Sequence, residues 1–465
     1  MALCSRVVSR SLYSPVCSYL CTEAMSKEDL DAFFAPPCTV CGSTSLDRGL
    51  FAREVELPAV KLNTPSLVSK FLSHLSHVIL KYPLLKRVVS ITDEEGKESK
   101  ALLLLPESLR PHTLSPTDHD WITTNGGEET THTVHLTYPD SYSHSAILRA
   151  LLPESVKEVP TGFEAIGHIA HYNLRENAMP FKSIIGQVTL DKHQLIKTVV
   201  NKTDQIDNTF RFFKMEVLAG EDNLVATINE NGCSFTFDFS KVYWNSRLHS
   251  EHNRLVGFLK RGESVLDVFA GVGPFSIPAA KKGCVIYAND LNPHSYDYLC
   301  ENAKRNKVHK QISTYNLDGR EFIRKVTELF LDQIIDGQSA MYSHVIMNLP
   351  AIAYTFLDTF RGLFSRVPHS RRRELVMPTI HCYGFSKCPN SPEQDSLNTV
   401  VKSLRVKELI KGTYSLYLVR KVAPNKTMTR VSFQLPEEVA YAQGVGAIES
   451  ELGQPSPKRT RIDNY

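Results

Sequence analysis

The segment from Ser264 to Phe275 constrains the fold of this chain more than any other. It reads Ser264-Val-Leu-Asp-Val-Phe-Ala-Gly-Val-Gly-Pro-Phe, in which an apolar run typical of a buried parallel strand precedes two glycines. Gly271 and Gly273 allow a tight turn and let a ligand approach the backbone. A short helix is expected from Pro274 to Gly283. This order of strand, glycine turn and helix predicts one half of a nucleotide-binding doubly wound sheet.

A second apolar run, from Cys284 to Asp290, predicts the next parallel strand and ends on a carboxylate. In doubly wound folds an acid at this position accepts hydrogen bonds from ribose hydroxyls, and we expect Asp290 to do so. Leu291, the next residue, is assigned to the same cofactor site.

The residues of the glycine turn discriminate between two cofactors. A nicotinamide site requires Gly-x-Gly-x-x-Gly, but here Pro274 follows the second glycine and Ser276 stands at the third position. Asp267 comes four residues before Gly271. A carboxylate there repels a pyrophosphate and attracts the ammonium group of a methionine moiety. The turn therefore favours S-adenosylmethionine over NAD, and a turn that binds no ligand is the remaining alternative.

Later strands add polar residues at the same edge of the predicted sheet. A strand that begins at Ile312 leads to Asp318, which could meet an adenine amino group, and to Gly319, assigned to the same site. A fourth strand runs from Tyr342 and ends in Asn348-Leu-Pro, at the carboxyl end of its strand, where ligands of open α/β sheets bind. Asn348 can present oxygens there to an amino group of a planar base. Residues 379–385 continue the sheet, and residues 409–420 and 429–435 predict a closing hairpin.

The N-terminal half of the chain carries no catalytic signature. We expect a strand over residues 55–61, a helix over 66–85, a buried strand over 100–106 and a polar surface loop over 113–142. This region could be an RNA-docking module or a lid. A small α+β unit follows, with strands near residues 162–174, 198–200, 212–218 and 233–239 and a helix over 179–190.

Composition limits the class of protein. With 465 residues the chain can form two or three domains, and 42% hydrophobic residues are typical of a globular protein. No apolar run approaches the roughly 20 residues of a membrane span, so no membrane partner is expected. A net charge of +3 requires any basic surface to be local. The ten cysteines form no framework and are expected to be reduced; the pair Cys38 and Cys41 is attributed to chance, and no metal site is predicted.

The two ends of the chain are expected to be leader and tail. Residues 1–22 contain Arg6, Arg10 and serines but no acidic residue, which is typical of a mitochondrial transit peptide; an ordinary disordered N-terminus is the alternative. The polar tail ends near Lys458-Arg-Thr-Arg461, a weak nuclear signal or simply part of a disordered segment.

The segment from Ser240 to Arg254 combines basic and aromatic residues around one carboxylate, a combination that suits phosphates and unstacked bases. These residues are Lys241, Arg247, Arg254, Tyr243, Trp244 and Glu251. An exposed amphipathic helix is the alternative interpretation.

Taken together, these motifs resemble the class I methyltransferases that act on nitrogen, and more closely the tRNA (guanine-37-N1) methyltransferase family of archaea and eukaryotes. The resemblance extends from about Gly162 to Pro436. It rests on Gly167-His-Ile-Ala-His, Phe210-Arg-Phe-Phe, Val242-Tyr-Trp-Asn-Ser-Arg-Leu-His-Ser-Glu, Asp267-Val-Phe-Ala-Gly-Val-Gly-Pro-Phe, Asp290-Leu-Asn-Pro and Asn348-Leu-Pro. One departure is Ser246, where members commonly carry proline.

The resemblance implies an α/β fold with a Rossmann-like class I methyltransferase domain, a preceding small α+β domain and an N-terminal RNA-docking domain. The expected boundaries are 1–46 for transit peptide and leader, 47–154 for the docking domain, 155–240 for the α+β domain, 241–440 for the methyltransferase domain and 441–465 for the tail. A monomer is expected, since three linked domains suit the grip of one tRNA.

The resemblance also implies methyl transfer from S-adenosylmethionine to N1 of guanosine 37 in cytoplasmic and mitochondrial tRNAs, and the first step toward wybutosine in tRNA-Phe. By the family pattern Glu251 is the general base and Arg211 stabilises charge on O6. Asn348 holds the amino edge of the base, Tyr243 helps to seat it, and His252 reaches the cofactor carboxylate.

Other readings stay open. The related family that moves the aminocarboxypropyl group of the same cofactor onto a wybutosine precursor is the nearest enzymatic alternative. A catalytically silent tRNA-binding adaptor and an NAD-dependent oxidoreductase are more distant. Arg211 and Glu251 could instead be surface charges, and Tyr243 a core residue. A mitochondrial matrix location is expected, with cytoplasmic and nuclear pools possible.

Overall fold

The computed structural model describes residues 27–37, 41–92, 96–106, 114–206, 213–336 and 341–443. The chain divides into two compact units, one of residues 1–162 and 174–194 and one of residues 163–173 and 195–465. The domain boundaries expected near residues 154 and 240 remain predictions.

The first unit is built on an antiparallel sheet of order β2-β3-β1-β4. Its strands are β1 (Arg53–Leu62), β2 (Val88–Thr92), β3 (Glu98–Leu103) and β4 (Gly127–Leu136). The strands expected near residues 55–61 and 100–106 are therefore confirmed. Helices α2 (Val68–His74) and α3 (Pro116–Thr124) supply Phe71 and Ile122 to a core shared with Val60, Leu62 and Leu102 of the sheet.

The surface loop expected over residues 113–142 is wrong. Within the described part of this segment, α3 begins at a capping box formed by Ser115 and Asp118, and β4 pairs with β1 along its whole length. The threonines and histidines that suggested a loop lie on a strand that is largely exposed on one face, where threonine is a good strand former. The helix expected over residues 66–85 is also too long, because α2 ends at His74.

Further helices of the first unit are α1 (Lys27–Phe33), α4 (Tyr138–Ser141), α5 (His144–Leu151) and α6 (Lys182–Lys192), with the 3₁₀-helices η2 (Gly49–Phe51), η3 (Pro65–Leu67) and η5 (Glu176–Phe181). The helix expected over 179–190 is present as η5 followed by α6. Asp191 of α6 accepts hydrogen bonds from Arg48 and from the Tyr138 hydroxyl, which ties α6 to earlier parts of the unit.

The second unit contains a small sheet of order β5-β6-β7-β8 and a separate hairpin. Their strands are β5 (Glu164–Ile166), β6 (Ile169–Tyr172), β7 (Thr198–Ile206), β8 (Phe213–Gly220), β9 (Val225–Glu230) and β10 (Cys233–Asp238). The side chains of Asn302 and Asn306 bond to the backbone of Thr236 and Ser234, so the hairpin is fixed to a helix of the larger fold.

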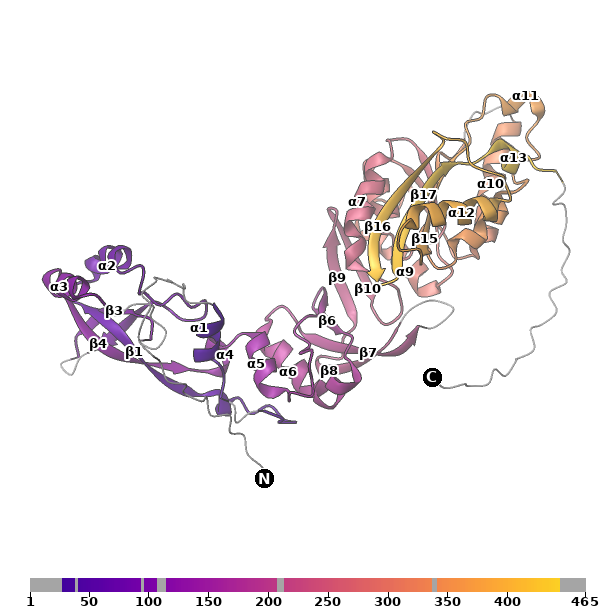
Figure 1. The fold of residues 1–465 in the computed structure, drawn as a ribbon. Helices are drawn as coiled ribbons and strands as arrows, with labels where there is room; N and C mark the ends of the chain where they lie inside the picture. The colour runs from indigo at the N-terminus through magenta and orange to yellow at the C-terminus, as the bar shows by residue number, and fades with distance from the viewer. Residues whose placement is uncertain are drawn as a thin grey trace. The chain divides into compact units, whose positions relative to one another are not determined.

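A seven-stranded sheet of order β13-β12-β11-β14-β15-β17-β16 forms the centre of this unit (Figure 1). Its strands are β11 (Ser264–Asp267), β12 (Val285–Asn289), β13 (Ile312–Tyr315), β14 (His344–Met347), β15 (Thr379–Ser386), β16 (Tyr414–Ala423) and β17 (Lys426–Gln434). Neighbouring strands are parallel except for β17, which is antiparallel to both of its neighbours. The Rossmann-like sheet and the closing hairpin are therefore confirmed.

Helices cover this sheet and enclose two apolar cores, one around Val265 and Ile277 and one around Leu266 and Phe322. They are α7 (His249–Phe258), α8 (Ser276–Lys282), α9 (Pro293–Arg305), α10 (Gly319–Ile335), α11 (His369–Arg372), α12 (Pro392–Leu404) and α13 (Glu437–Ala440), with the 3₁₀-helices η6 (Ser246–Leu248) and η7 (Ala353–Phe360). The strand order reverses between β11 and β14, which in doubly wound folds marks the ligand crevice.

Two further sequence expectations concern absences. None of the helices within the described residues is both long and apolar enough to cross a bilayer. Among the same residues, no three side chains of the metal-binding types are grouped as a metal site requires. Cys38 lies outside the described residues, while the Sγ atom of Cys41 lies 3.9 Å from the carbonyl oxygen of Leu152.

Candidate active site

The glycine turn follows β11 and is held by backbone hydrogen bonds. The amide of Ala270 donates to the carbonyl of Asn289 at 2.7 Å, and the amide of Gly273 donates to Ala270 at 2.9 Å. Gly271 and Gly273 have φ values of 55° and 99°, which side-chain-bearing residues rarely adopt. A Cβ atom at Gly273 would lie 2.8–2.9 Å from Ile277 and Leu299, whereas a Cβ at Gly271 would meet nothing within 4 Å. Of these two glycines, only Gly271 therefore faces open space.

This difference predicts distinct effects of two alanine substitutions. Gly273→Ala is expected to lower the thermal midpoint, because overpacking and backbone strain together cost on the order of 3 kcal/mol. Gly271→Ala should cost about 1 kcal/mol of strain and mainly weaken cofactor binding, because the added methyl group occupies space left for a ligand. Thermal melting and calorimetric titration with S-adenosylmethionine separate the two effects. Equal losses of stability and unchanged affinity for Gly271→Ala would contradict this assignment.

Asp267 ends β11 and is fully buried beside the turn. The Ser276 hydroxyl donates to its Oδ2 at 2.7 Å, but within the described residues its Oδ1 has no hydrogen-bond partner. Burial raises the pKa of Asp267 to about 7, and the nearby Asp290 adds to the shift. A buried acceptor without a donor fits the ammonium group predicted from the sequence, since an arriving cation favours the ionised carboxylate.

Asp290 follows β12 and contacts the same turn. Its Oδ2 accepts from the amide of Gly271 at 2.8 Å and its Oδ1 from the amide of Asn292 at 2.9 Å. Burial raises the pKa of Asp290 to about 6, while these two backbone donors oppose the shift. Each oxygen keeps a second acceptor position, as binding of two ribose hydroxyls requires. Leu291 is exposed beside it.

Asn289 has a positioning role that sequence reasoning missed. Its Nδ2 donates to the carbonyls of Val268 and Leu317, and its Oδ1 accepts from the amide of Leu317. One buried amide therefore joins the loops that follow β11 and β13. Its place immediately before Asp290 was the only sequence signal.

Asp318 and Gly319 begin α10. Asp318 is the N-cap, with its Oδ1 accepting from the amide of Arg320 at 2.8 Å, and its side chain is exposed. Gly319 is buried, and a Cβ there would lie 3.0–3.1 Å from Phe269, Phe356 and Val268. Close packing explains this glycine, and the exposed Asp318 retains acceptor capacity for an amino group.

Asn348 follows β14 at the carboxyl edge of the sheet. In the described part of the chain its buried Oδ1 has no hydrogen-bond partner. Met347 pairs with Cys382 of β15, so Asn348 stands level with Tyr383 in the neighbouring strand. This orphan acceptor fits the amino group of a planar base.

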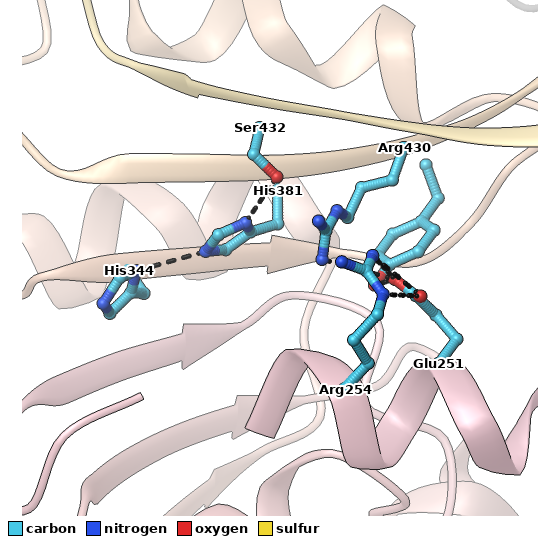
Figure 2. A network of polar contacts seen from close by, with 7 residues as sticks. Glu251, Arg254, His344, His381, Arg430 and Ser432 are labelled. Carbon is cyan, nitrogen blue, oxygen red and sulfur yellow. Dashed lines mark hydrogen bonds and ion pairs between the residues drawn. The ribbon is translucent and has the colours of Figure 1, made fainter. Parts of the chain in front are cut away.

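Glu251 lies on the inner face of α7 with 5% of its surface exposed. Its carboxylate accepts four hydrogen bonds from three side chains (Figure 2). Arg254 donates through Nε to Oε2 at 2.9 Å and through Nη2 to Oε1 at 3.0 Å. The Tyr383 hydroxyl donates to Oε1 at 2.7 Å, and Nη1 of Arg430 does so at 3.3 Å. The alternative that Glu251 is a surface charge is wrong, because its side chain is buried.

Two of these residues, Tyr383 and Arg430, belong to one row across the sheet, together with Tyr417. Tyr383 of β15 is paired with Arg430 of β17, and Arg430 is paired with Tyr417 of β16. The Arg254 guanidinium lies 3.4 Å from the ring centroid of Tyr417. Sequence reasoning missed Tyr383 and Arg430, because only the sheet brings them to Glu251, from 132 and 179 residues away.

The neighbouring row in Figure 2 carries His381 and Ser432, which share a hydrogen bond of 2.8 Å. The other ring nitrogen of His381 contacts His344 at 3.1 Å. Burial, His344 and the two nearby guanidinium groups hold the pKa of His381 well below its usual range. This imidazole is therefore neutral and adds no charge beside Glu251.

His252, next to Glu251 on α7, is buried and shares a hydrogen bond of 2.6 Å with Glu230 of β9. Its ring packs edge-on against Phe275 of the glycine turn, with centroids 4.7 Å apart. His252 therefore lies against the glycine turn, and Glu230 orients it.

Tyr243 precedes η6 and is 48% exposed, so the alternative of a core residue is wrong. Trp244 is buried instead and stacks on Phe237. Lys241 pairs with Asp238, and Arg247 is exposed. The Ser246 hydroxyl donates to Glu164 at 2.5 Å, a contact that a proline at this position could not make.

The structure thus brings Tyr383 and Arg430 into contact with Glu251, places Tyr383 level with Asn348, and gathers Asp267, Gly271 and Asp290 around the turn. Arg211, the residue expected to contact O6, lies outside the described residues.

Comparisons with known proteins agree with this geometry. A family model described as the TRM5/TYW2 methyltransferase domain matches residues 226–367, and one described as the TYW2 N-terminal domain matches residues 145–223. The tRNA (guanine(37)-N(1))-methyltransferase of Danio rerio is 45% identical over 448 residues, covering 94% of this chain and 91% of that protein. The enzyme of the same name from Homo sapiens is 41% identical over 451 residues, covering 95% and 86%.

Solved structures show a similar fold. Trm5b from Pyrococcus abyssi has a TM-score of 0.56 and 23% identity, covering 81% of this chain and 99% of that one. A complex of aTrm5 and tRNALeu has a TM-score of 0.56 and 20% identity, with 82% and 100% coverage. At these identities the likeness concerns the fold.

Proposed function

Since the chain belongs to the tRNA (guanine(37)-N(1))-methyltransferase family, we propose that it transfers the methyl group of S-adenosylmethionine to N1 of guanosine 37 in tRNA. The observation that carries the mechanism is the buried Glu251 carboxylate, which accepts a hydrogen bond from Tyr383. Tyr383 stands level with Asn348 in the neighbouring strand, and the Oδ1 of Asn348 has no hydrogen-bond partner among the described residues. An acid and an amide acceptor at the carboxyl edge of a doubly wound sheet suit the N1–H and amino edge of guanine.

The cofactor fits the residues around the glycine turn. Asp267 offers a carboxylate oxygen without a partner in the described part of the chain, Asp290 keeps acceptor positions for hydroxyl groups, and Gly271 leaves space beside the backbone. His252, oriented by Glu230, lies against the same turn and suits the cofactor carboxylate. When bound, S-adenosylmethionine supplies an electrophilic methyl group on a sulfonium.

The reaction requires a separate role from each residue that is proposed to contact the guanine base. Guanine N1 carries a proton at neutral pH and becomes nucleophilic when a base removes it, which is the role proposed for Glu251. The electron pair left on N1 delocalises onto O6, where the guanidinium of Arg211 stabilises it by the family pattern. Asn348 accepts from the amino group, and the exposed Tyr243 stacks on the base. The nucleotide must leave its stack to reach this site.

The proposed RNA partner also suits the first unit. A hollow on that unit is lined by Lys81, Tyr82, Lys86 and Arg87 among others. Basic groups beside an aromatic ring bind phosphates and bases. We assign tRNA docking to this unit, with one monomer acting on one tRNA.

A transfer assay with two labels tests the function. Purified protein and a tRNA transcript with guanosine 37 should incorporate label from the methyl carbon of S-adenosylmethionine and none from its carboxyl carbon. A transcript with adenosine 37 is the matched control and should remain unlabelled. Label from the carboxyl carbon alone would identify an aminocarboxypropyl transferase, the second candidate, which the TYW2 N-terminal match of residues 145–223 favours. Cofactor binding without either label would identify a silent adaptor.

Cellular location and tRNA range are part of the proposal. The arginines and serines of residues 1–22, without an acidic residue, support import into the mitochondrial matrix, with further pools in cytoplasm and nucleus. The substrates would then include mitochondrial and cytoplasmic tRNAs, and methylated tRNA-Phe would enter wybutosine synthesis. A fluorescent protein fused to residues 1–46 should enter mitochondria, and an Arg6→Glu, Arg10→Glu version should not.

A further inference from the structure

The two oxygens of the Glu251 carboxylate have different surroundings. Oε1 accepts from Tyr383, Arg430 and Arg254, and the first two of these are buried residues of the sheet. Oε2 contacts only Arg254 among the described residues. Arg254 is 25% exposed and lies on α7 with Glu251, so its side chain can move away while the sheet keeps its hydrogen bonds, at the cost of the contact with the Tyr417 ring.

A general base requires a free lone pair directed at the proton that it accepts. Oε1 accepts three hydrogen bonds and has no lone pair left for a proton. Oε2 gains a free lone pair once Arg254 moves aside. Burial and the Glu251 charge raise the pKa of Tyr383 well above its usual value, so its hydroxyl keeps its proton and remains a donor. Two residues of the sheet, Tyr383 and Arg430, therefore bond to Oε1, whereas Oε2 is bonded by Arg254 of α7.

We propose that Tyr383 and Arg430 are positioning residues that hold Oε1 of Glu251, and that Oε2 accepts the N1 proton of guanosine after Arg254 has moved off it. This inference rests on the proposed role of Glu251 as the base. The N1–H bond breaks, an Oε2–H bond forms, and the electron pair of N1 stays on the guanine.

Charge supports the same order of events. A neutral, protonated Glu251 would leave Arg430 and Arg254 without their carboxylate, and a buried unpaired guanidinium is costly. Arg254, which has already moved off Glu251, then gains a partner in the negative charge that proton transfer leaves on the guanine. Since His381 is neutral, no other cation of the neighbouring row changes this balance.

Tyr383→Phe tests the anchor, because it removes one hydroxyl and keeps the ring. Tyr342→Phe is the matched control: Tyr342 is equally buried in this unit, and its hydroxyl bonds to Thr327 rather than to Glu251. We expect Tyr383→Phe to lower single-turnover methyl transfer about tenfold at neutral pH. We also expect it to move the acidic limb of the pH–rate profile to higher pH, because a carboxylate that loses a donor is more easily protonated. Affinity for S-adenosylmethionine and the control variant should change less than about twofold.

A rate loss without a shift of the acidic limb, or equal effects of Tyr383→Phe and Tyr342→Phe, would overturn the inference. Arg430→Lys is the second variant; it keeps the charge and should shift the limb in the same direction but by less than Arg430→Met. If wild-type protein methylates tRNA and Glu251→Gln does not, while Tyr383→Phe and Arg430→Met behave as wild type, only this inference fails. If wild-type protein transfers no methyl group, the proposed function fails instead.

Discussion

Glu251→Gln is expected to lower the rate of methyl transfer by about 10²–10⁴-fold, the usual contribution of a positioned general base. Glutamine keeps the shape of the side chain and can still accept from Tyr383, but it cannot take the N1 proton. Single-turnover transfer to tRNA with guanosine 37, at saturating cofactor, measures the loss. Calorimetric affinity for S-adenosylmethionine should change little, because the residues assigned to the cofactor surround the glycine turn.

The matched control for this change is Glu263→Gln. Glu263 lies just before β11, pairs with His344 and has no assigned role in binding or chemistry. Its replacement should leave the transfer rate close to that of wild type. A Glu251→Gln protein that is folded, binds the cofactor and keeps more than a tenth of the wild-type rate would remove Glu251 from the mechanism.

Asp267→Asn should have two opposite effects, on cofactor affinity and on stability. The cofactor loses the carboxylate that meets its ammonium group, so its affinity should fall at least about tenfold, as expected for a charge-assisted contact. The same change should stabilise the cofactor-free protein above pH 7. Burial holds the pKa of Asp267 at about 7 in the folded protein, against an ordinary value of 3.8. Ionising it in the folded state therefore costs free energy.

The sign of the pH dependence follows from the same shift. Between about pH 4 and pH 7 the unfolded chain releases the Asp267 proton while the folded protein keeps it, so stability falls as pH rises through this window. The loss is on the order of 4 kcal/mol, from about 1.4 kcal/mol per pKa unit. Asp290, with a pKa raised to about 6, contributes in the same direction over a narrower window.

Thermal melting of cofactor-free protein from pH 4 to pH 8 measures this effect. The slope should be shallower for Asp267→Asn than for wild type. Asp332→Asn, a change of an exposed acid on α10, is the control and should leave the slope unchanged. A wild-type slope that Asp267→Asn does not reduce would show that Asp267 ionises normally.

Much of the second unit could be predicted from the sequence. Short apolar runs that end in Asp267, Asp290 and Asn348 identify buried parallel strands and their carboxyl ends, because a strand covered on both faces must be apolar throughout. Two glycines, Gly271 and Gly273, identify the turn, because its backbone needs positive φ values that glycine adopts readily. These are properties of adjacent residues, so they can be read without the fold.

Other features could not be predicted, because their cause is not local. Tyr383 and Arg430 look like ordinary strand residues, and only pairing of β15 with β17 places both beside Glu251. The sequence of β4 predicts a loop because one face of the strand is polar and exposed, and a polar sequence is also typical of loops. The positioning role of Asn289 depends on two loops that are far apart in the sequence, so it could be recognised only from the fold.

The most direct test of the central claim is nucleoside mass spectrometry of tRNA incubated with the protein and S-adenosylmethionine carrying a deuterated methyl group. The account predicts deuterated 1-methylguanosine, located at position 37 by mapping of nuclease fragments, with wild-type protein and almost none with Glu251→Gln. A tRNA that carries no deuterated methyl group, a methyl group on another atom or nucleotide, or equal product from the Glu251→Gln protein would contradict it.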